Sequence, residues 1–290
     1  MSAVKILITS QKGGVGKSTI SANLAAYFSD VKFKRVTLID FDHQATASYW
    51  MKRCISRAAI RVCDALSYKS SGLSLLKAKE ELRIASAASD IVIADLTWVD
   101  IFPASFFFDY DLIIIPSSLS GIELASATDF LTRFAPVFNS RNLHTPQIIL
   151  MPNRLLDINN YRVFFNNCGF PVPFSLTSPI MFSKPAQESF GETYFFKSGD
   201  SALKDSFLVV CKEIEELVID LVERKNKRMQ TLTGVASITR SNGGGLLDKF
   251  IAIRNAARKE EAVPAPRMKA KAVPALRMKA EHKWFGFFQR

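Results

Sequence analysis

The sequence lacks several features that would assign it to a well-known class of protein. No apolar run approaches the roughly 20 residues that a membrane-spanning helix requires. The first residues lead into a strand-like segment without the apolar core of a signal peptide. The four cysteines are scattered with no C-x-x-C pair, so neither a disulfide framework nor a structural zinc site is expected. We therefore expect a cytoplasmic protein.

Acidic residues are scarce only towards the C-terminal end. The 290 residues carry a formal net charge of +11. Fourteen basic and four acidic residues follow residue 225, which gives that segment a net charge of +10. Residues 1–225 hold 24 basic and 23 acidic residues. The body of the chain is therefore nearly neutral, and its C-terminal segment carries nearly all of the net positive charge.

Composition changes at the same place, which predicts a body at residues 1–225 and a tail at residues 226–290. The tail contains a glycine-rich stretch at 241–245 and two copies of a nine-residue repeat at 262–270 and 272–280. A proline-containing repeat this short cannot form a packed unit, and two copies are too few for a solenoid. We expect a flexible, extended and basic C-terminal tail.

Strand and helix signals alternate along the body. Short apolar runs rich in β-branched residues occur at 4–9, 35–39, 90–94, 111–115 and 147–151. Apolar residues recur at helical spacing, or helical stretches are expected, at 18–29, 121–138, 157–167 and 202–224. Continuous apolar runs are typical of strands that are buried on both faces. The sequence therefore predicts an α/β fold with a mainly parallel central sheet flanked by helices.

A glycine-rich turn follows the first strand and opens the first helix. It reads Q-K-G-G-V-G-K-S-T over residues 11–19, which is the context that a phosphate-binding loop requires. Glycines allow successive backbone N–H groups to face one anion at the positive end of the helix that follows. Lys17 would reach the β- and γ-phosphates, and the Ser18 hydroxyl would ligate Mg²⁺. The residues expected to hold the nucleotide are Gly13, Gly14, Val15, Gly16, Lys17, Ser18 and Thr19.

Gln11 stands where the usual phosphate-loop pattern has its first glycine, and Lys12 follows it. This K-G-G-x-G-K-[ST] variant resembles the deviant Walker A motif of the ParA/MinD family of P-loop ATPases. The resemblance implies that the chain binds ATP and Mg²⁺, forms a homodimer around ATP, and uses slow hydrolysis as a release switch. It also implies that Lys12 reaches across the dimer to the phosphates bound by the partner subunit. A solvated lysine at a turn is the alternative for Lys12.

Carboxylates follow two of the predicted strands. Residues 38–44 look like the family's D-x-D-P-Q segment, with His43 where most members have proline. The resemblance implies that Asp40 lies near the magnesium ion and that Asp42 positions the attacking water. Residues 90–95 have the form of a Walker B strand, at whose end Asp95 would hold Mg²⁺ through a water. Each aspartate alone could cap an element, but their joint placement favours a magnesium site.

Weaker similarities continue to about residue 224. Asn153 resembles the family's asparagine that reads the edge of adenine, and Ser117 lies in the companion loop. Iron–sulfur relatives with the same loop need cysteine thiolates at a dimer interface, and no such pair is present in the sequence. The resemblance therefore implies an ATP hydrolase, with Lys12, Lys17 and Asp42 at the catalytic positions and a partner protein that stimulates turnover.

What such an ATPase would position depends on the tail and on its partners. Two basic tails in a dimer could bind the phosphate backbone of DNA without sequence preference, which would suit the partition of DNA or of a protein assembly. Residues 245–254 could instead form a short amphipathic helix, and aromatic residues among cations at 282–290 suit an anionic membrane surface. The same end could dock into a partner protein as an adaptor. A solubilising extension without a partner stays open as well.

Overall fold

The computed structural model describes residues 3–42, 44–63, 71–98, 100, 102–140, 144–188 and 191–241. The chain divides into two compact units, Met1–Arg228 and Met229–Arg290. The second unit is described only as far as residue 241, and its backbone is helical there. The glycine-rich stretch beyond Ser241, the repeats and the aromatic end of the expected tail lie outside the described residues. The proposed division at residue 225 stays a prediction.

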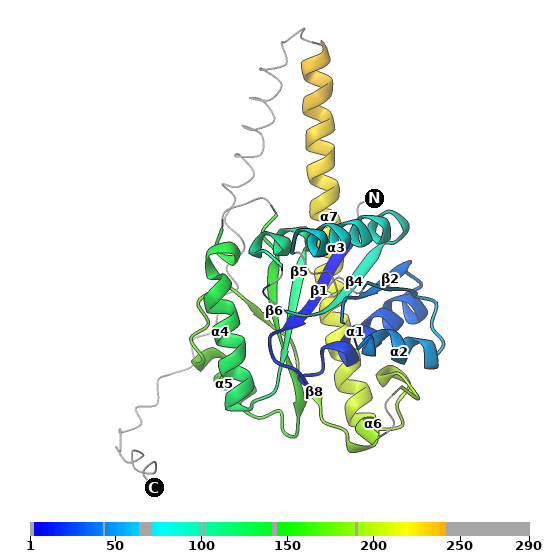
Figure 1. The fold of residues 1–290 in the computed structure, drawn as a ribbon, viewed down its shortest axis with the longest axis vertical. Helices are drawn as coiled ribbons and strands as arrows, with labels where there is room; N and C mark the ends of the chain where they lie inside the picture. The colour runs from blue at the N-terminus through cyan, green and yellow to red at the C-terminus, as the bar shows by residue number, and fades with distance from the viewer. Residues whose placement is uncertain are drawn as a thin grey trace. The chain divides into compact units, whose positions relative to one another are not determined.

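A parallel sheet forms the centre of the first unit (Figure 1). Its strands lie in the order β3-β2-β4-β1-β5-β6-β7, and β8 pairs with β6. The ladders between these strands are parallel. The strands are β1 (Val4–Ser10), β2 (Val36–Asp40), β3 (Ala59–Val62), β4 (Ile91–Thr97), β5 (Leu112–Ser117), β6 (Gln147–Leu155), β7 (Ser175–Leu176) and β8 (Ile180–Met181). The expected α/β class with a mainly parallel sheet is confirmed.

Helices connect the strands and cover the sheet. The α-helices are α1 (Lys17–Ala26), α2 (Thr46–Arg53), α3 (Ser71–Ala88), α4 (Gly121–Phe138), α5 (Tyr161–Asn167), α6 (Lys184–Glu188) and α7 (Ser201–Ser241). Short helical segments are the π-turn η1 (Tyr27–Val31) and the 3₁₀-helices η3 (Ala104–Asp109) and η4 (Phe195–Lys197). No helix among the described residues is both long enough and apolar enough to cross a membrane.

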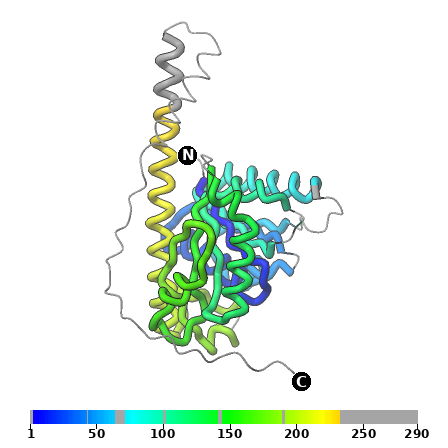
Figure 2. The backbone as a smooth tube through the Cα atoms, turned by 90° about the vertical axis from the view of Figure 1, so that its left-hand side faces the viewer, coloured from blue at the N-terminus to red at the C-terminus, as the bar shows by residue number. Residues whose placement is uncertain are grey.

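Each face of the sheet has its own hydrophobic core. Along β1, Val4, Ile6 and Ile8 belong to a core shared with α1, α2 and α7. Leu7 points the other way, into a core shared with α3, α4 and α5. Successive side chains of a strand alternate between faces, so a strand that is apolar throughout is buried on both. Figure 2 shows α7 on one side of the sheet and α3 on the other.

Aromatic side chains dominate the second of these cores. Phe107 of η3 is fully buried and stacks on Trp98, with ring centroids 4.2 Å apart. It also meets Phe134 at 5.0 Å and Phe138 at 4.9 Å, both from α4. Aromatic pairs at such separations add to the free energy gained from burial alone. This cluster fixes α4 and the end of β4 against each other, beside the carboxyl edge of the sheet.

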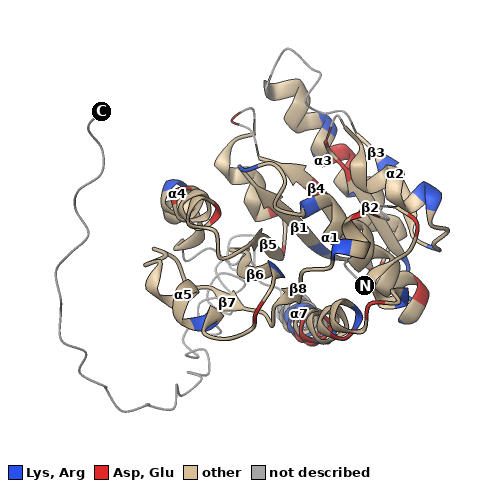
Figure 3. Cartoon of the chain, turned by 90° about the horizontal axis from the view of Figure 1, so that it is seen from below, with Lys and Arg blue, Asp and Glu red and all other residues tan. Residues whose placement is uncertain are grey.

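The helix α7 packs as the sequence indicates, because Phe207, Cys211 and Ile214 lie in the first core. At the amino-terminal edge of the sheet, the Lys225 ammonium donates to Asp111 Oδ2 at 2.7 Å and to the Ala3 carbonyl at 2.8 Å. Figure 3 shows residues of both charge signs along α7. The helix continues beyond residue 224, where the sequence analysis ended it.

Other elements differ from expectation for local reasons. The helix α5 begins at Tyr161, later than residue 157, after Asn160 adopts a left-handed φ of 60°. The helix α1 ends at Ala26 and passes into the π-turn η1. The sequence analysis did not assign α2, α3 or β3. The strand β3 has only four residues and pairs with β2, so its periodic signal is short.

Phe107→Ala should lower the free energy of unfolding by about 3–5 kcal/mol, because it leaves a cavity inside the aromatic cluster. Urea denaturation measures this change. Phe164→Ala is the matched control, since the Phe164 side chain on α5 is 52% exposed, and it should cost less than about 1 kcal/mol. Similar losses in the two variants would contradict the role of the cluster.

Candidate functional site

The glycine-rich turn joins β1, a central strand of the sheet, to the start of α1. Gly14 and Gly16 have φ values of 75° and 97°, in the left-handed region that favours glycine. A Cβ atom at Gly16 would also collide with the side-chain amide of Asn153. The fold therefore requires glycine at position 16, both for the backbone conformation and for the close approach of Asn153 on β6.

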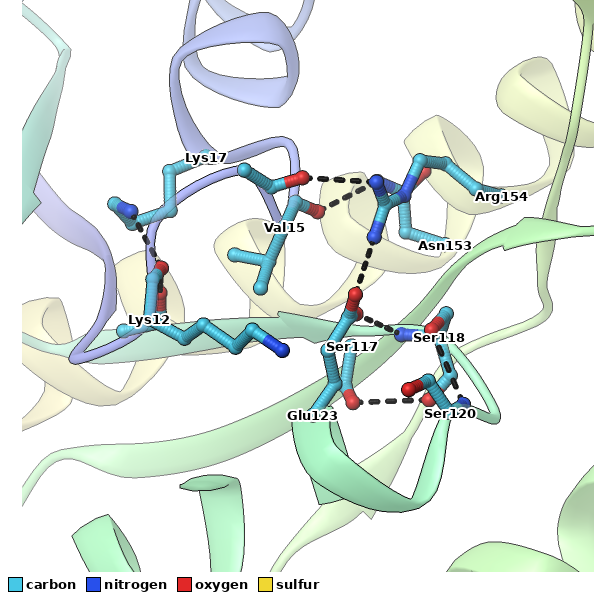
Figure 4. A network of polar contacts seen from close by, with 11 residues as sticks. Lys12, Val15, Lys17, Ser117, Ser118, Ser120, Glu123, Asn153 and Arg154 are labelled. Carbon is cyan, nitrogen blue, oxygen red and sulfur yellow. Dashed lines mark hydrogen bonds and ion pairs between the residues drawn. The ribbon is translucent and has the colours of Figure 1, made fainter. Parts of the chain in front are cut away.

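Donors from other elements bind the carbonyl groups of this loop (Figure 4). The Asn153 side-chain amide donates to the Val15 carbonyl at 2.9 Å, and the Arg154 guanidinium donates to the Gly14 carbonyl at 2.8 Å. The carbonyl and N–H of one planar trans peptide point in opposite directions. Binding these two carbonyls from outside therefore turns the N–H groups of Val15 and Gly16 the other way. This orientation is what an anion-binding loop requires.

Lys17 is buried at the start of α1, with 6% of its surface exposed. Its ammonium donates to the Lys12 carbonyl at 3.1 Å, and the Ser10 hydroxyl donates to the same oxygen at 2.7 Å. Burial lowers the pKa of Lys17, whereas the negative charges of Asp95 and Asp42 act to raise it. Figure 4 shows the side chain of Lys12 extending away from Lys17, towards Ser117 and Glu123. The two lysines of the motif thus serve different sides of the loop.

Asp40 is the last residue of β2, and it is paired with Asp95 of the neighbouring strand β4. Both are buried. Asp40 accepts hydrogen bonds from the backbone N–H of Ser48 at 2.8 Å and of Asp42 at 3.2 Å. Burial nevertheless raises the pKa of Asp40. Burial also raises the pKa of Asp95 to about 7, and the nearby charge of Asp40 adds to this effect.

The donor set around Asp95 fits a divalent cation. Its Oδ1 accepts a hydrogen bond from the Ser21 hydroxyl at 3.2 Å, whereas its buried Oδ2 has no hydrogen-bond partner. Two buried carboxyl groups side by side repel each other when ionised, and a cation between oxygen ligands removes that repulsion. Among the described residues, no cluster of three or more acidic, histidine or cysteine side chains could hold a metal alone. A cation here would need further oxygen ligands besides these carboxyl groups.

Asp42 lies two residues after the end of β2, and two hydrogen bonds hold its carboxylate. Its Oδ1 accepts the backbone N–H of Gln44 at 3.0 Å, and its Oδ2 accepts the Thr97 hydroxyl at 3.0 Å. The sequence analysis assigned no role to Thr97, because it lies 55 residues away on another strand. His43 lies outside the described residues, so the effect of replacing the family's proline is not part of this geometry.

A cavity of about 210 Å³ adjoins the loop. Gly14, Gly16 and Thr19 line it from the loop and α1, and Asn153 and Arg154 line it from the end of β6. The segment 180–183 closes it from the side of β8. The structure thus brings together the loop, Asn153 and the three aspartates that the sequence analysis singled out. Their roles in binding and catalysis stay predictions.

Asp95→Asn should change how stability depends on pH in the metal-free, nucleotide-free protein. The pKa of Asp95 is raised to about 7 in the folded state, so the folded protein holds this proton more tightly than the unfolded chain does. The stability that this provides is complete below about pH 4 and is lost as the pH rises through about 7. A difference of about three pKa units corresponds to a loss of roughly 4 kcal/mol in the free energy of unfolding. Urea denaturation at pH 4.5 and pH 8 should show a smaller loss in the variant. Equal losses would contradict a raised pKa at Asp95.

Comparison with known proteins places this site in a family. The family model of the CobQ/CobB/MinD/ParA nucleotide binding domain matches residues 6–262. The sporulation initiation inhibitor protein Soj of Bacillus subtilis (strain 168) is 34% identical over 119 residues, which are 41% of this chain and 36% of Soj. This chain spans half or less of the curated relatives it matches.

Solved structures share the fold at low sequence identity. Apo McdA of Cyanothece has a TM-score of 0.58 at 17% identity, covering 73% of this chain and 99% of McdA. The septum site-determining protein MinD of Pyrococcus horikoshii OT3, complexed with Mg-ADP, has a TM-score of 0.56 at 15% identity, covering 74% of this chain and 97% of MinD. Since the family model matches most of the chain, the protein belongs to the CobQ/CobB/MinD/ParA nucleotide-binding family.

Proposed function

We propose that this chain is a dimerising ATPase of the ParA/MinD type, which binds ATP with Mg²⁺ and hydrolyses it to release a cargo. The observation that carries the proposal is the phosphate loop with its carbonyl groups held from outside, next to the buried carboxyl groups of Asp40 and Asp95. The site suits a nucleoside triphosphate and its cation, because it combines a pre-oriented loop, a buried lysine and an unpartnered carboxylate oxygen.

Lys17 and the acidic groups would share the binding of the phosphates and the cation. The Lys17 ammonium donates to a carbonyl of the loop itself, and phosphate oxygens would replace that carbonyl as its partner. Ser18 at the start of α1, with Asp40 and Asp95, would hold Mg²⁺ directly or through water. The cation supplies positive charge that stabilises the transferring phosphoryl group. MinD with Mg-ADP supports this assignment, because it has the same fold.

Asp42 would orient the water that attacks the γ-phosphate. Such a site needs no covalent nucleophile, because catalysis of phosphoryl transfer depends mainly on positioning and electrostatics. The Thr97 hydroxyl fixes one carboxylate oxygen of Asp42, which leaves its orientation tied to the end of β4. A motion of either strand end on nucleotide binding would therefore move the group that positions the water. We expect turnover to be slow until a partner protein stimulates it.

Lys12 is the residue that connects hydrolysis with dimerisation. Its side chain extends away from the Lys17 side of the loop, and in the dimer it would reach the phosphates bound by the partner subunit. ATP would then favour the dimer, and hydrolysis would weaken it. We further propose that the basic tail docks the dimer onto DNA through phosphate contacts, so that the switch partitions DNA or a protein assembly. The protein would act in the cytoplasm.

Asp42→Ala should lower the rate of ATP hydrolysis by at least about a hundredfold, the usual scale for removing a group that directs proton transfer. It should keep ATP affinity, so an ATP-bound dimer should accumulate in analytical ultracentrifugation. Lys17→Ala should bind no ATP. Asp205→Ala, at an exposed position of α7, is the matched control and should behave as the wild type. Unchanged turnover in Asp42→Ala would exclude the role given to this residue.

Replacing four tail lysines by glutamine in the full chain should weaken DNA binding. Each lost phosphate contact should reduce the slope of log K against log salt by about 0.9. The replaced residues are Lys269, Lys271, Lys279 and Lys283. Cosedimentation with duplex DNA across a salt series measures the effect, and anionic liposomes provide the parallel arm.

The control for the tail replaces four lysines of the body instead. These are Lys34, Lys52, Lys204 and Lys212. Retained DNA binding in the tail variant, with loss in the body variant, would move the contact to the body. Loss of liposome binding alone would assign the tail to a membrane surface, and no loss in either arm would remove the tail from docking.

A further inference from the structure

Arg154 combines an unfavourable backbone conformation with two well-placed contacts. Its φ is 60°, a left-handed value that costs free energy for a residue with a Cβ atom. It lies at a register irregularity of β6, between Asn153 and Leu155, where β6 pairs with β8. Irregularities of this kind redirect a side chain at the end of a strand and are frequent beside functional sites. The conformation therefore points to a role for the Arg154 side chain.

The Arg154 guanidinium bridges two parts of the site (Figure 4). One nitrogen donates to the Gly14 carbonyl at 2.8 Å, and another forms an ion pair with Glu123 Oε1 at 2.7 Å. Glu123 lies in the first turn of α4, and its Oε2 accepts the backbone N–H of Ser118 at 2.8 Å. The phosphate loop, the loop after β5 and the end of β6 are thus joined through the Arg154–Glu123 pair.

Glu123 is a firmly fixed partner. Its side chain is 11% exposed, compared with 39% for Arg154. Burial acts to raise the pKa of Glu123, but the hydrogen bond from Ser118 and the contact with Arg154 outweigh burial and lower the pKa. Glu123 is therefore charged at neutral pH, and it holds the planar guanidinium in one orientation. Arginine suits this task because its donors form a rigid fork.

Two consecutive residues of β6 hold two consecutive carbonyls of the loop. Asn153 binds the Val15 carbonyl and Arg154 binds the Gly14 carbonyl. Each contact fixes the peptide whose N–H would face a phosphate. Without the guanidinium, the peptide between Gly14 and Val15 could rotate, because glycine restricts its neighbour's orientation least. Nucleotide binding would then have to order the loop, which lowers affinity.

We propose that Arg154, held by Glu123, is a positioning residue that pre-orients the phosphate loop for the nucleotide. The proposal rests on the ATP site proposed above and adds a residue outside the glycine-rich motif. Arg154 acts on the backbone of the loop, through a carbonyl, and the charge of its guanidinium is already engaged by Glu123. It therefore sets the affinity for nucleotide more than the rate of the chemical step.

The Arg154→Gly variant separates this role from a contribution to folding. Glycine accepts a φ of 60° without strain, so the variant should unfold at the same temperature as the wild type or above it. It should still bind a fluorescent ATP analogue about ten times more weakly or worse, the scale expected for one charge-assisted hydrogen bond. The turnover number at saturating ATP should change less than about threefold, so that the loss falls on KM. Unchanged ATP affinity would overturn the proposal.

Two further variants test how Arg154 acts. Arg154→Lys keeps the positive charge but not the fork, so its affinity should stay close to that of Arg154→Gly. Recovery of wild-type affinity would show that charge alone matters and would overturn the positioning role. Arg162→Ala is the matched control, because Arg162 is an exposed arginine of α5 that lies over the Tyr161 ring. It should bind ATP as the wild type does.

A double-mutant cycle tests the coupling with Glu123. Glu123→Gln should weaken ATP binding, and its effect should largely disappear in the Arg154→Gly background, because the two residues act as one unit. Additive losses would overturn the part assigned to Glu123. Wild-type protein and Lys17→Ala frame the series. If wild-type protein binds no ATP, the proposed function fails, whereas wild-type binding with unchanged Arg154→Gly binding contradicts this inference alone.

Discussion

The orientation of three peptide groups after β1 is the constraint on which the site depends. Backbone N–H groups can face an anion only if the carbonyls of the same peptides face elsewhere and find donors there. In this protein the carbonyls of Lys12, Gly14 and Val15 are bound by side chains, and two of those side chains come from the end of β6. The parallel sheet makes this arrangement practical, because β1 and β6 both end at its carboxyl edge, on either side of β5.

The same edge concentrates charge that the fold alone does not neutralise. Asp40 and Asp95 are buried on adjacent strands, and one oxygen of Asp95 has no hydrogen-bond partner. Burial away from water opposes ionisation and raises the pKa of both groups, and the charge of Asp40 adds to the rise at Asp95. We infer that the cation and nucleotide complete the site electrostatically, so that binding would also stabilise the protein. A switch that responds to its ligand needs such a difference between its bound and free states.

Charge is distributed differently outside the site. The body is nearly neutral and its surface carries both signs, whereas the residues after 225 account for most of the net positive charge. In the proposed function this separates two tasks. The body would bind and hydrolyse ATP, and the tail would determine what the body is attached to. Such a division would let the same nucleotide chemistry serve different cargoes, because long-range attraction to a phosphate surface requires no change in the site.

The sequence by itself determined the α/β class, and it pointed to the phosphate loop and to the aspartates near the carboxyl ends of β2 and β4, because each is a local pattern of neighbouring residues. Short elements such as β3 escaped it, since four residues carry little periodic signal. Only the tertiary structure decided which groups hold the loop and the aspartates in place. Asn153 and Arg154 lie 138 and 140 residues from the carbonyls they bind, and Thr97 lies 55 residues from Asp42. Contacts across such separations follow from the order of strands and from packing, and no local pattern of residues specifies them.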